Sequence, residues 1–222
     1  MKKVEIDEIL RYMGHRGEAD EALLSMVHRC AGQMSEAAQP RHVSAPFPLE
    51  FLGEGAVRFA GIRVESRDLA AHLKKGIPSL EGMPSQKGGQ VILFAATLGA
   101  QADRLISREG AKSISHALCL DACATFLLES YCDNVEAGFW ENGGACAAAS
   151  RFSPGYGDFD IGCQAGILKA LEAGKAIGLF ETDGHMLAPQ KSITAVIGLG
   201  APGKGPQKCR GCAMLNCPFR KE

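Results

Sequence analysis

The sequence predicts a protein of the α+β class, with strands and helices that do not follow one another in a regular order. Short runs of alternating or continuous apolar residues are typical of strands, and apolar residues at intervals of three and four are typical of helices. Both patterns occur along the 222 residues. Their order is too irregular for a doubly wound parallel sheet, and no internal repeat is visible.

Composition and charge restrict the class of partner. Apolar residues make up 46% of the chain and charged residues 22%, which is ordinary for a globular protein. The net charge of −1 gives no broad basic surface, so we expect no nucleic-acid partner. No apolar run approaches the roughly 20 residues of a membrane span, and residues 1–8 are too acidic for a signal peptide. We therefore expect a cytoplasmic protein without a membrane partner.

Two helices are expected at the start of the chain. Residues 6–12 form a short helical pattern that stops at Gly14, and a second helix is expected to begin at Glu18 or Asp20 and to run to about Ala37. The inner face of this second helix is expected to contain Leu23, Leu24, Met26, Val27 and Cys30.

Extended segments follow these helices. Residues 41–48 should be extended, because their two prolines disfavour helix at the preceding positions. Residues 57–59 and 62–64 alternate around Gly61, which predicts a strand pair or a bulged strand.

The middle of the chain combines helices with one buried strand. Ser66 is expected to cap a helix over residues 68–75. Residues 91–97 begin as a continuous apolar run, which predicts a central strand. Helices are predicted over 101–108 and 113–134, and the second is apolar around most of its circumference, so it should be buried on several sides.

Local signals also define the last elements. A glycine-rich linker is expected over residues 138–150, and a strand over 192–199. Between them, Asp158 or Asp160 is expected to cap a helix over 161–177.

Residues 151–158, with the sequence Arg-Phe-Ser-Pro-Gly-Tyr-Gly-Asp, carry the densest group of functional side chains. Arg151 offers a planar fork of N–H donors that suits a carboxylate or a phosphate. The two glycines let the backbone turn and approach another molecule closely. On residue types alone, the segment is either a ligand-binding loop or a tight surface turn whose tyrosine packs on the core.

This loop resembles the Arg-x-x-x-Gly-Tyr signature of the activation domain of cobalamin-dependent methionine synthase. Residues 185–192, His-Met-Leu-Ala-Pro-Gln-Lys-Ser, are similar to the methionine–proline stretch that leads into a late strand of that family. The small-residue helix of 116–132 fits the same order. Residues 12–17 and 95–99 resemble stand-alone short forms of the family. The resemblance implies that residues 1–200 form a C-shaped α+β domain with a central antiparallel sheet flanked by helices.

The resemblance also implies a ligand, S-adenosylmethionine, and roles for individual residues. Arg151 would pair with the methionine carboxylate, and Ser153 and Gly155 would offer backbone groups to the adenine. Tyr156 would contact the ligand and lie where cobalamin docks, which makes it the candidate catalytic residue. The family has an acidic residue shortly before the arginine, whereas residues 142–150 contain none.

The implied function is reactivation of cobalamin-dependent methionine synthase, or of a related corrinoid methyltransferase. The chain would supply S-adenosylmethionine for the reductive methylation of cob(II)alamin held by a corrinoid-binding partner subunit. A flavodoxin- or ferredoxin-like protein would donate the electron. The chain would then be an accessory subunit in methionine biosynthesis, of the methyltransferase class, rather than a stand-alone catalyst. It lacks an Asp-x-His-x-x-Gly loop, so cobalamin would be contacted in the partner.

The nine cysteines form two groups. Single cysteines in apolar segments, such as Cys119, Cys123 and Cys132, are expected to be reduced core residues. Residues 201–222 form a Cys-rich tail in which Cys209, Cys212 and Cys217 have the spacing of zinc or iron–sulfur ligands. Candidates for a fourth ligand are Cys146, Cys163 and His185. The alternatives are a zinc or iron–sulfur protein that scaffolds a corrinoid partner or passes electrons to it, and a reducible tail without metal.

A rival motif lies at residues 198–205, which spell Gly-x-Gly-x-x-Gly and nearly spell a P-loop. Both motifs require a following helix whose N-terminus binds phosphate. No helical pattern follows here, and Gly205 stands where a P-loop has Ser or Thr. We therefore expect these glycines to form a linker.

Overall fold

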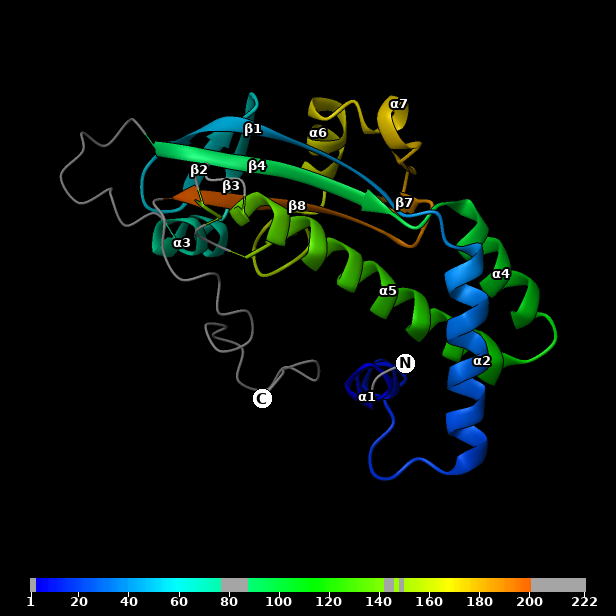
Figure 1. Ribbon diagram of the computed structural model, residues 1–222. Coiled ribbons are helices and arrows are strands. Elements are labelled where there is room, and N and C mark those ends of the chain that lie inside the picture. The colour runs from blue at the N-terminus through cyan, green and yellow to red at the C-terminus, as the bar shows by residue number, and fades with distance from the viewer. Residues whose placement is uncertain (1–2, 77–87, 142–145, 148–149, 201–222) are drawn as a thin grey trace.

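The structure, a computed structural model, describes residues 3–76, 88–141, 146–147 and 150–200 (Figure 1). The helices are α1 (Lys3–Tyr12), α2 (Glu21–Ala37), α3 (Arg67–Gly76), α4 (Ala100–Gly110), α5 (Ile114–Glu141), α6 (Cys163–Ala170) and α7 (Ala173–Ile177). The strands are β1 (Arg41–Phe51), β2 (Ala56–Phe59), β3 (Ile62–Glu65), β4 (Gly88–Thr97), β5 (Cys146–Ala147), β6 (Phe180–Glu181), β7 (Leu187–Ala188) and β8 (Ser192–Gly200).

One antiparallel sheet organises the molecule. Six strands pair in the order β3-β2-β1-β4-β8-β5, and β6 and β7 form a separate pair. On β4, Phe94 lies opposite Ser44 of β1 and Ala195 of β8. This arrangement confirms the predicted α+β class, the central antiparallel sheet and the central position of the strand over residues 91–97.

Each face of the sheet is covered by its own set of helices. Because successive side chains of a strand point to opposite faces, Ile92 and Phe94 of β4 lie on one face of the sheet, and Val91 and Leu93 lie on the other. Ile92 and Phe94 pack with apolar residues of α1, α2, α4 and α5. Val91 and Leu93 pack with residues of α3, α6 and α7. Figure 1 shows α5 crossing one side of the sheet, with α6 and α7 on the other.

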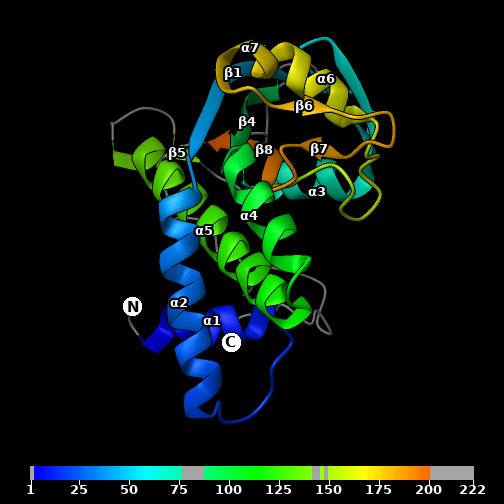
Figure 2. The ribbon, with the colours of Figure 1, turned by 90° about the vertical axis from the view of Figure 1, so that its right-hand side faces the viewer.

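The arrangement has the curved outline that the C shape predicts. In Figure 1 the sheet runs along the top, α2 descends on the right and α1 lies below. The view turned by 90° shows α1, α2 and α5 gathered together below the sheet (Figure 2).

Local capping signals account for the starts of two helices. Oδ1 of Asp20 accepts a hydrogen bond of 2.8 Å from the amide of Leu23, so α2 begins directly after Asp20 rather than at Glu18. Oγ of Ser66 accepts a bond of 2.9 Å from the amide of Leu69 at the start of α3. Both caps satisfy amides of a first helical turn that have no carbonyl partner within the helix.

The second helix buries the face that the sequence predicts, although not uniformly. Val27 and Cys30 are fully buried, and so is Met34 one turn further on. The remaining predicted positions are partly buried against the same core: Leu23, Leu24 and Met26. The single cysteines of α5 are buried and unpaired, as expected: Cys119, Cys123 and Cys132.

Helix α5 is longer than predicted, and the expected linker of residues 138–150 is wrong at its start. The helix continues to Glu141 instead of ending near Asn134. Val135 and Phe139, spaced by four residues, extend its apolar face and pack against the core. This packing outweighs the low helix propensity of Gly138.

The single helix predicted over residues 161–177 is two helices. Glu172 lies between α6 and α7 and has a left-handed backbone with φ of 47°. The turn lets Leu168 and Leu171 on one side of it, and Ala173 and Ile177 on the other, reach the same core.

Asp158 caps a helix, but not the predicted one. Its carboxylate accepts hydrogen bonds of 2.8 Å from the amide of Arg67 and 3.1 Å from the amide of Asp68, and a third from the hydroxyl of Ser66. It therefore caps α3. Asp160 accepts a bond of 2.9 Å from the amide of Gly162, the residue before α6.

None of the helices in the described part of the chain combines the length and the apolar character that a membrane crossing requires.

Candidate functional site

The signature loop is tied to the sheet at its start. The amide of Phe152 donates to the carbonyl of Val196 on β8 over 3.0 Å, and the amide of Val196 donates back over 2.9 Å. The ring of Phe152 packs between those of His72 and Phe159, at centroid distances of 5.0 and 6.2 Å. Further along, the amide of Gly155 donates to the carbonyl of Phe159 over 2.7 Å. These contacts hold the loop in a defined conformation.

The end of the loop packs closely on α3, and Gly157 makes this possible. Its φ of 55° lies in the left-handed region, and a Cβ atom here would overlap the carboxylate of Asp68. The next residue, Asp158, accepts its hydrogen bonds from the first turn of α3. This glycine is thus required by the packing of the loop, whether or not a ligand is bound.

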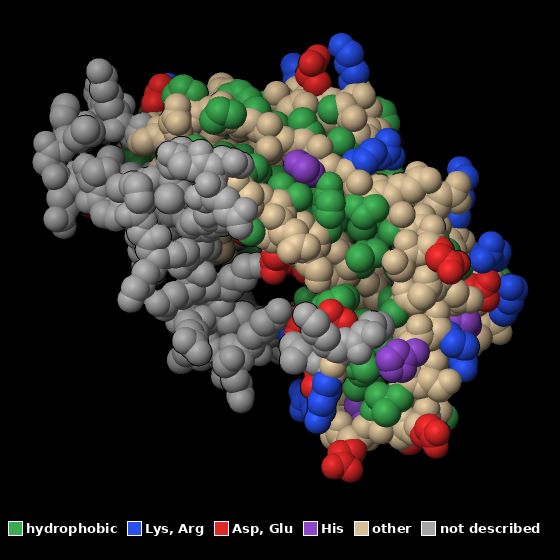
Figure 3. Space-filling model, in the orientation of Figure 1, with side chains coloured by type: hydrophobic (Ala, Val, Ile, Leu, Met, Phe, Trp, Pro, Cys, Tyr) green, Lys and Arg blue, Asp and Glu red, His purple; other side chains and the backbone are tan. Residues whose placement is uncertain are grey.

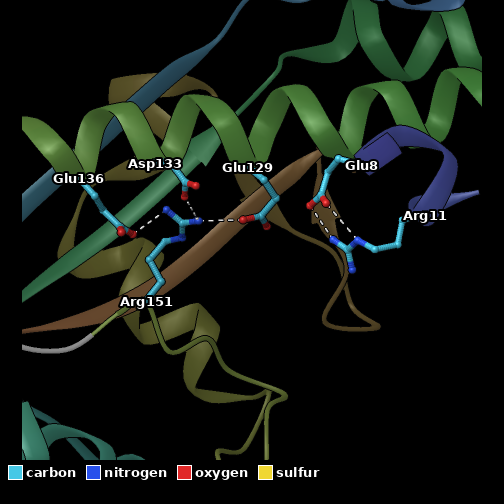
Figure 4. A network of polar contacts seen from close by, with 6 residues as sticks. All are labelled: Glu8, Arg11, Glu129, Asp133, Glu136 and Arg151. Carbon is cyan, nitrogen blue, oxygen red and sulfur yellow. Dashed lines mark hydrogen bonds and ion pairs between the residues drawn. The ribbon is translucent and has the colours of Figure 1, made fainter. Parts of the chain in front are cut away.

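Arg151 lies at the centre of an ionic cluster with three carboxylates of α5 (Figure 4). Nη1 donates to Glu136 over 2.6 Å. Nη2 donates to Glu129 over 2.7 Å and to Asp133 over 2.9 Å. The Arg151 side chain is only 9% exposed and that of Glu136 only 5% exposed, whereas Glu129 and Asp133 are 41% and 42% exposed.

The charge of Arg151 is maintained by its carboxylate partners. Burial by itself would lower the pKa of Arg151, but Glu136 and Glu129 outweigh it and raise this pKa above its ordinary value. The guanidinium therefore stays charged, and one cation faces three carboxylates. Two of these carboxylates, Glu129 and Asp133, are half-exposed and so face solvent.

Helix α1 lies beside the same face of α5. Figure 4 shows Glu8 and Arg11 of α1 next to Glu129, and the two α1 side chains form an ion pair of 2.6 Å. Burial, followed by the charges of Glu129 and Glu8, raises the pKa of Tyr12 to about 12. The carboxylate of Glu129 thus interacts electrostatically with Tyr12 of α1 and accepts a hydrogen bond from Arg151 of the signature loop.

A cleft of about 300 Å³ opens beside this cluster. It is bounded by α5, the signature loop, α6 and the segment that leads from β7 into β8. Its lining residues are Thr125, Leu128, Glu129, Ser153, Pro154, Tyr156, Gln164, Leu187, Gln190, Lys191, Ser192, Ile193 and Thr194. The two stretches that carry the sequence resemblance, although some thirty residues apart in the chain, therefore form walls of one cleft. The space-filling view shows acidic side chains bordering a hollow between the sheet and the lower helices (Figure 3).

The predicted ligand-binding residues occupy different positions in this arrangement. Ser153 and Tyr156 line the cleft, and Tyr156 is 67% exposed. Arg151 reaches the cleft through Glu129, to which its Nη2 donates. The amide of Gly155 is bonded within the loop to Phe159. The binding roles that the resemblance implies for these residues stay predictions.

The opposite wall of the cleft is held by α4 and α5. The amides of Gln190 and Lys191 donate to the carboxylate of Asp103 over 2.6 and 3.2 Å. Nζ of Lys191 donates to Oδ1 of Asp121 over 2.8 Å and to Oγ1 of Thr125 over 3.1 Å. The Lys191 side chain is 17% exposed, so a cation is fixed at this end of the cleft.

The acidic partners of Arg151 were not among the site residues that the sequence predicted. Residues 142–150 contain no acid, but Glu129, Asp133 and Glu136 precede the arginine by 15 to 22 residues. Their spacing of four and three residues places them on one face of a helix. That spacing is the signal in the sequence that could have revealed them.

The predicted metal ligands Cys209, Cys212 and Cys217 lie outside the described residues, so the metal site and the boundary at residue 200 stay predictions. Of the candidate fourth ligands, His185 pairs with Glu181 over 2.7 Å and Cys163 is half-buried. Within the described ranges, no group of three or more His, Cys, Asp or Glu side chains is arranged to hold a metal ion.

The architecture defines a class: an α+β domain with a central antiparallel sheet and a ligand-sized cleft between a long helix and a glycine-containing loop. No family model and no curated protein matches the sequence. Among solved structures, the chain is similar to the crystal structure of the MetH reactivation domain bound to AdoHcy. The match has a TM-score of 0.58 and 14% sequence identity, and it covers 87% of this chain and 73% of that one. The chain therefore has the fold of this reactivation domain, as the sequence resemblance implied.

Proposed function

We propose that this chain binds S-adenosylmethionine in the cleft and supports the reactivation of a cobalamin-dependent methionine synthase or a related corrinoid methyltransferase. One observation carries the proposal. The two stretches that resemble the methionine synthase activation domain meet at one cleft, in a fold shared with a domain whose structure contains AdoHcy. AdoHcy, S-adenosylhomocysteine, is S-adenosylmethionine without its methyl group.

The charge of the cleft suits such a ligand. S-adenosylmethionine carries a positive sulfonium and a positive ammonium group. The carboxylate of Glu129, which lines the cleft and is 41% exposed, favours both cations. In this assignment Glu129 accepts the ammonium group, and Arg151 holds Glu129 in place.

The rest of the lining suits the adenosine part. Leu128, Pro154, Leu187 and Ile193 provide apolar surface for a flat ring, and serine and threonine hydroxyls lie between them. The volume of about 300 Å³ is at the lower end of the range for small-molecule sites. S-adenosylmethionine is large enough to fill a cleft of this volume.

The exposed Tyr156 marks the side from which a partner would approach. A side chain that is 67% exposed beside a binding cleft is available for contact with a second protein. The partner would be a corrinoid-binding methionine synthase subunit. A flavodoxin- or ferredoxin-like donor would supply one electron to the cobalamin of this partner. The reduced cobalamin would then accept the methyl group from the sulfonium, and S-adenosylhomocysteine would remain in the cleft.

Calorimetric titration with S-adenosylmethionine and S-adenosylhomocysteine tests the binding step. We expect both ligands to bind the wild-type protein. Absence of detectable binding at millimolar ligand would rule out the proposed function.

The reactivation step needs a second assay. Formation of methylcobalamin is followed spectroscopically with a corrinoid partner, a reductant and S-adenosylmethionine, with and without this chain. We expect the chain to raise the rate and Tyr156→Ala to reduce that gain. Phe180→Ala is the matched control, because Phe180 is a 59% exposed aromatic residue that does not line the cleft. A rate that is indifferent to the chain would contradict the reactivation role.

A further inference from the structure

Two cations stand at the cleft, and a ligand with a carboxylate group could use either of them. Arg151 lies behind one wall and Lys191 forms part of the opposite one. The sequence resemblance favours Arg151. The contacts of the two side chains favour Lys191.

Arg151 is poorly placed to receive another anion. Three of its five N–H donors already bond to carboxylates, and its side chain is only 9% exposed. A ligand carboxylate at this guanidinium would also lie beside Glu129, Asp133 and Glu136. Like charges at such short range repel strongly in a partly buried site. A ligand carboxylate at Arg151 would therefore bind against the repulsion of the α5 carboxylates.

Lys191 has the opposite properties. Its Nζ contacts a single carboxylate, Asp121, and the neutral hydroxyl of Thr125. An ammonium group has three N–H donors, so these two partners leave one donor for a ligand. Because Asp121 is itself 49% exposed, solvent weakens its hold on the ammonium.

The backbone of Lys191 is fixed in the position that such a contact requires. Its amide donates to Asp103 over 3.2 Å, and its carbonyl accepts a bond of 2.9 Å from the amide of Leu98. The ammonium contacts Thr125 on α5, and Glu129 lies one helical turn further on, roughly 6 Å along the axis. The carboxylate and ammonium groups of an α-amino acid share one carbon atom, and Lys191 and Glu129, which both line the cleft, offer a partner of the opposite charge to each group.

We propose that Lys191 is the residue that binds the carboxylate group of the ligand, and that it selects adenosyl compounds with an intact amino-acid end. This inference rests on the proposed function, because it assigns one end of the same ligand. Arg151 is then a positioning residue that acts through Glu129, in place of the direct ligand contact that the sequence predicts.

The test compares two ligands that differ only in the carboxylate. Wild type and Lys191→Met are titrated calorimetrically with S-adenosylmethionine and with decarboxylated S-adenosylmethionine. We expect Lys191→Met to weaken binding of the first ligand by about 10- to 100-fold, the range for a hydrogen bond between charged groups. Binding of the second should change by less than about twofold, which also shows that the variant is folded. Lys191→Arg should recover part of the loss.

Lys169→Met is the matched control, because Lys169 is an exposed lysine of α6 that does not line the cleft. Equal losses for both ligands, or no loss for either, would overturn the role of Lys191 and leave the proposed function standing. Failure of the wild type to bind either ligand would overturn the proposed function, and this inference with it.

Discussion

Replacement of Arg151 by methionine should strongly destabilise the fold, even without any ligand. Methionine keeps an apolar stem at this position but removes the guanidinium. The change leaves the carboxylate of Glu136, which is 5% exposed, without its 2.6 Å cationic partner. It also removes the Nη2 atom to which the carboxylates of Glu129 and Asp133 are both paired.

The expected magnitude follows from the burial of each pair. Breaking a buried ion pair by removal of one partner costs about 3–5 kcal/mol. The pairs with Glu129 and Asp133, which are 41% and 42% exposed, contribute below about 1 kcal/mol each. We therefore expect Arg151→Met to lower the free energy of unfolding by about 3–5 kcal/mol. A second substitution, Glu136→Gln, should restore about 1–3 kcal/mol by removing the buried charge that Arg151 no longer neutralises.

Urea unfolding followed by circular dichroism measures these differences. Arg63→Met is the control, because Arg63 and Glu65 form a pair of 2.6 Å in which both side chains are at least 60% exposed. That change should cost no more than about 1 kcal/mol. If Arg151→Met costs no more than Arg63→Met, or if Glu136→Gln fails to restore stability, the account of the cluster is wrong.

Four further outcomes are expected. The hydroxyl of Ser66 and the amides of Arg67 and Asp68 lower the pKa of Asp158. The ionised Asp158 therefore stabilises the fold at pH values above its unfolded-state pKa, and this stabilisation is lost as the pH falls through its folded-state pKa. In urea titrations Asp158→Ala, which removes the cap, should cost about 1 kcal/mol at neutral pH, and the difference from wild type should shrink below about pH 4. Gly157→Ala should cost more than Gly14→Ala in the same assay, because both glycines have positive φ but only Gly157 faces a carboxylate where a Cβ would lie; equal losses would contradict this. Burial and the charges of Glu129 and Glu8 raise the pKa of Tyr12 to about 12, so a tyrosinate absorbance titration should lose its step near that pH in Tyr12→Phe and keep it in Tyr156→Phe. Elemental analysis of anaerobically purified protein should find zinc or iron that is lost in Cys212→Ser; metal-free wild type would leave the tail without this role.

The elements that local sequence determines were predictable. Asp20 and Ser66 cap α2 and α3 through hydrogen bonds to amides three residues away, and such bonds can be read from short motifs. The central position of β4 follows from its continuous apolar run, because a strand covered on both faces needs no polar side. The signature loop and the segment over residues 185–192 could be recognised as parts of a site because each is a contiguous motif.

Contacts between distant segments could not be read in this way. Asp158 was assigned to the next helix in the chain, but it caps α3, whose first residues lie some ninety positions earlier. The carboxylates around Arg151 were not predicted, and they lie 15 to 22 residues before it on α5. In both cases the packing of helices against the sheet determines which residues meet, and this packing is not evident from the residues that are adjacent in the sequence. The role inferred for Lys191 depends in turn on those carboxylates, so it emerges only once they are placed.

The way in which the signature loop is anchored has a consequence for the thermodynamics of binding. Its start is paired with β8 through Phe152, and its end is bonded to the first turn of α3 through Asp158. Ordering a backbone residue costs about 1–2 kcal/mol in conformational entropy at room temperature. For this loop the cost is borne by folding, since the anchoring contacts exist without a ligand. A ligand that enters the cleft therefore meets a preorganised wall, and more of its interaction energy remains available as affinity.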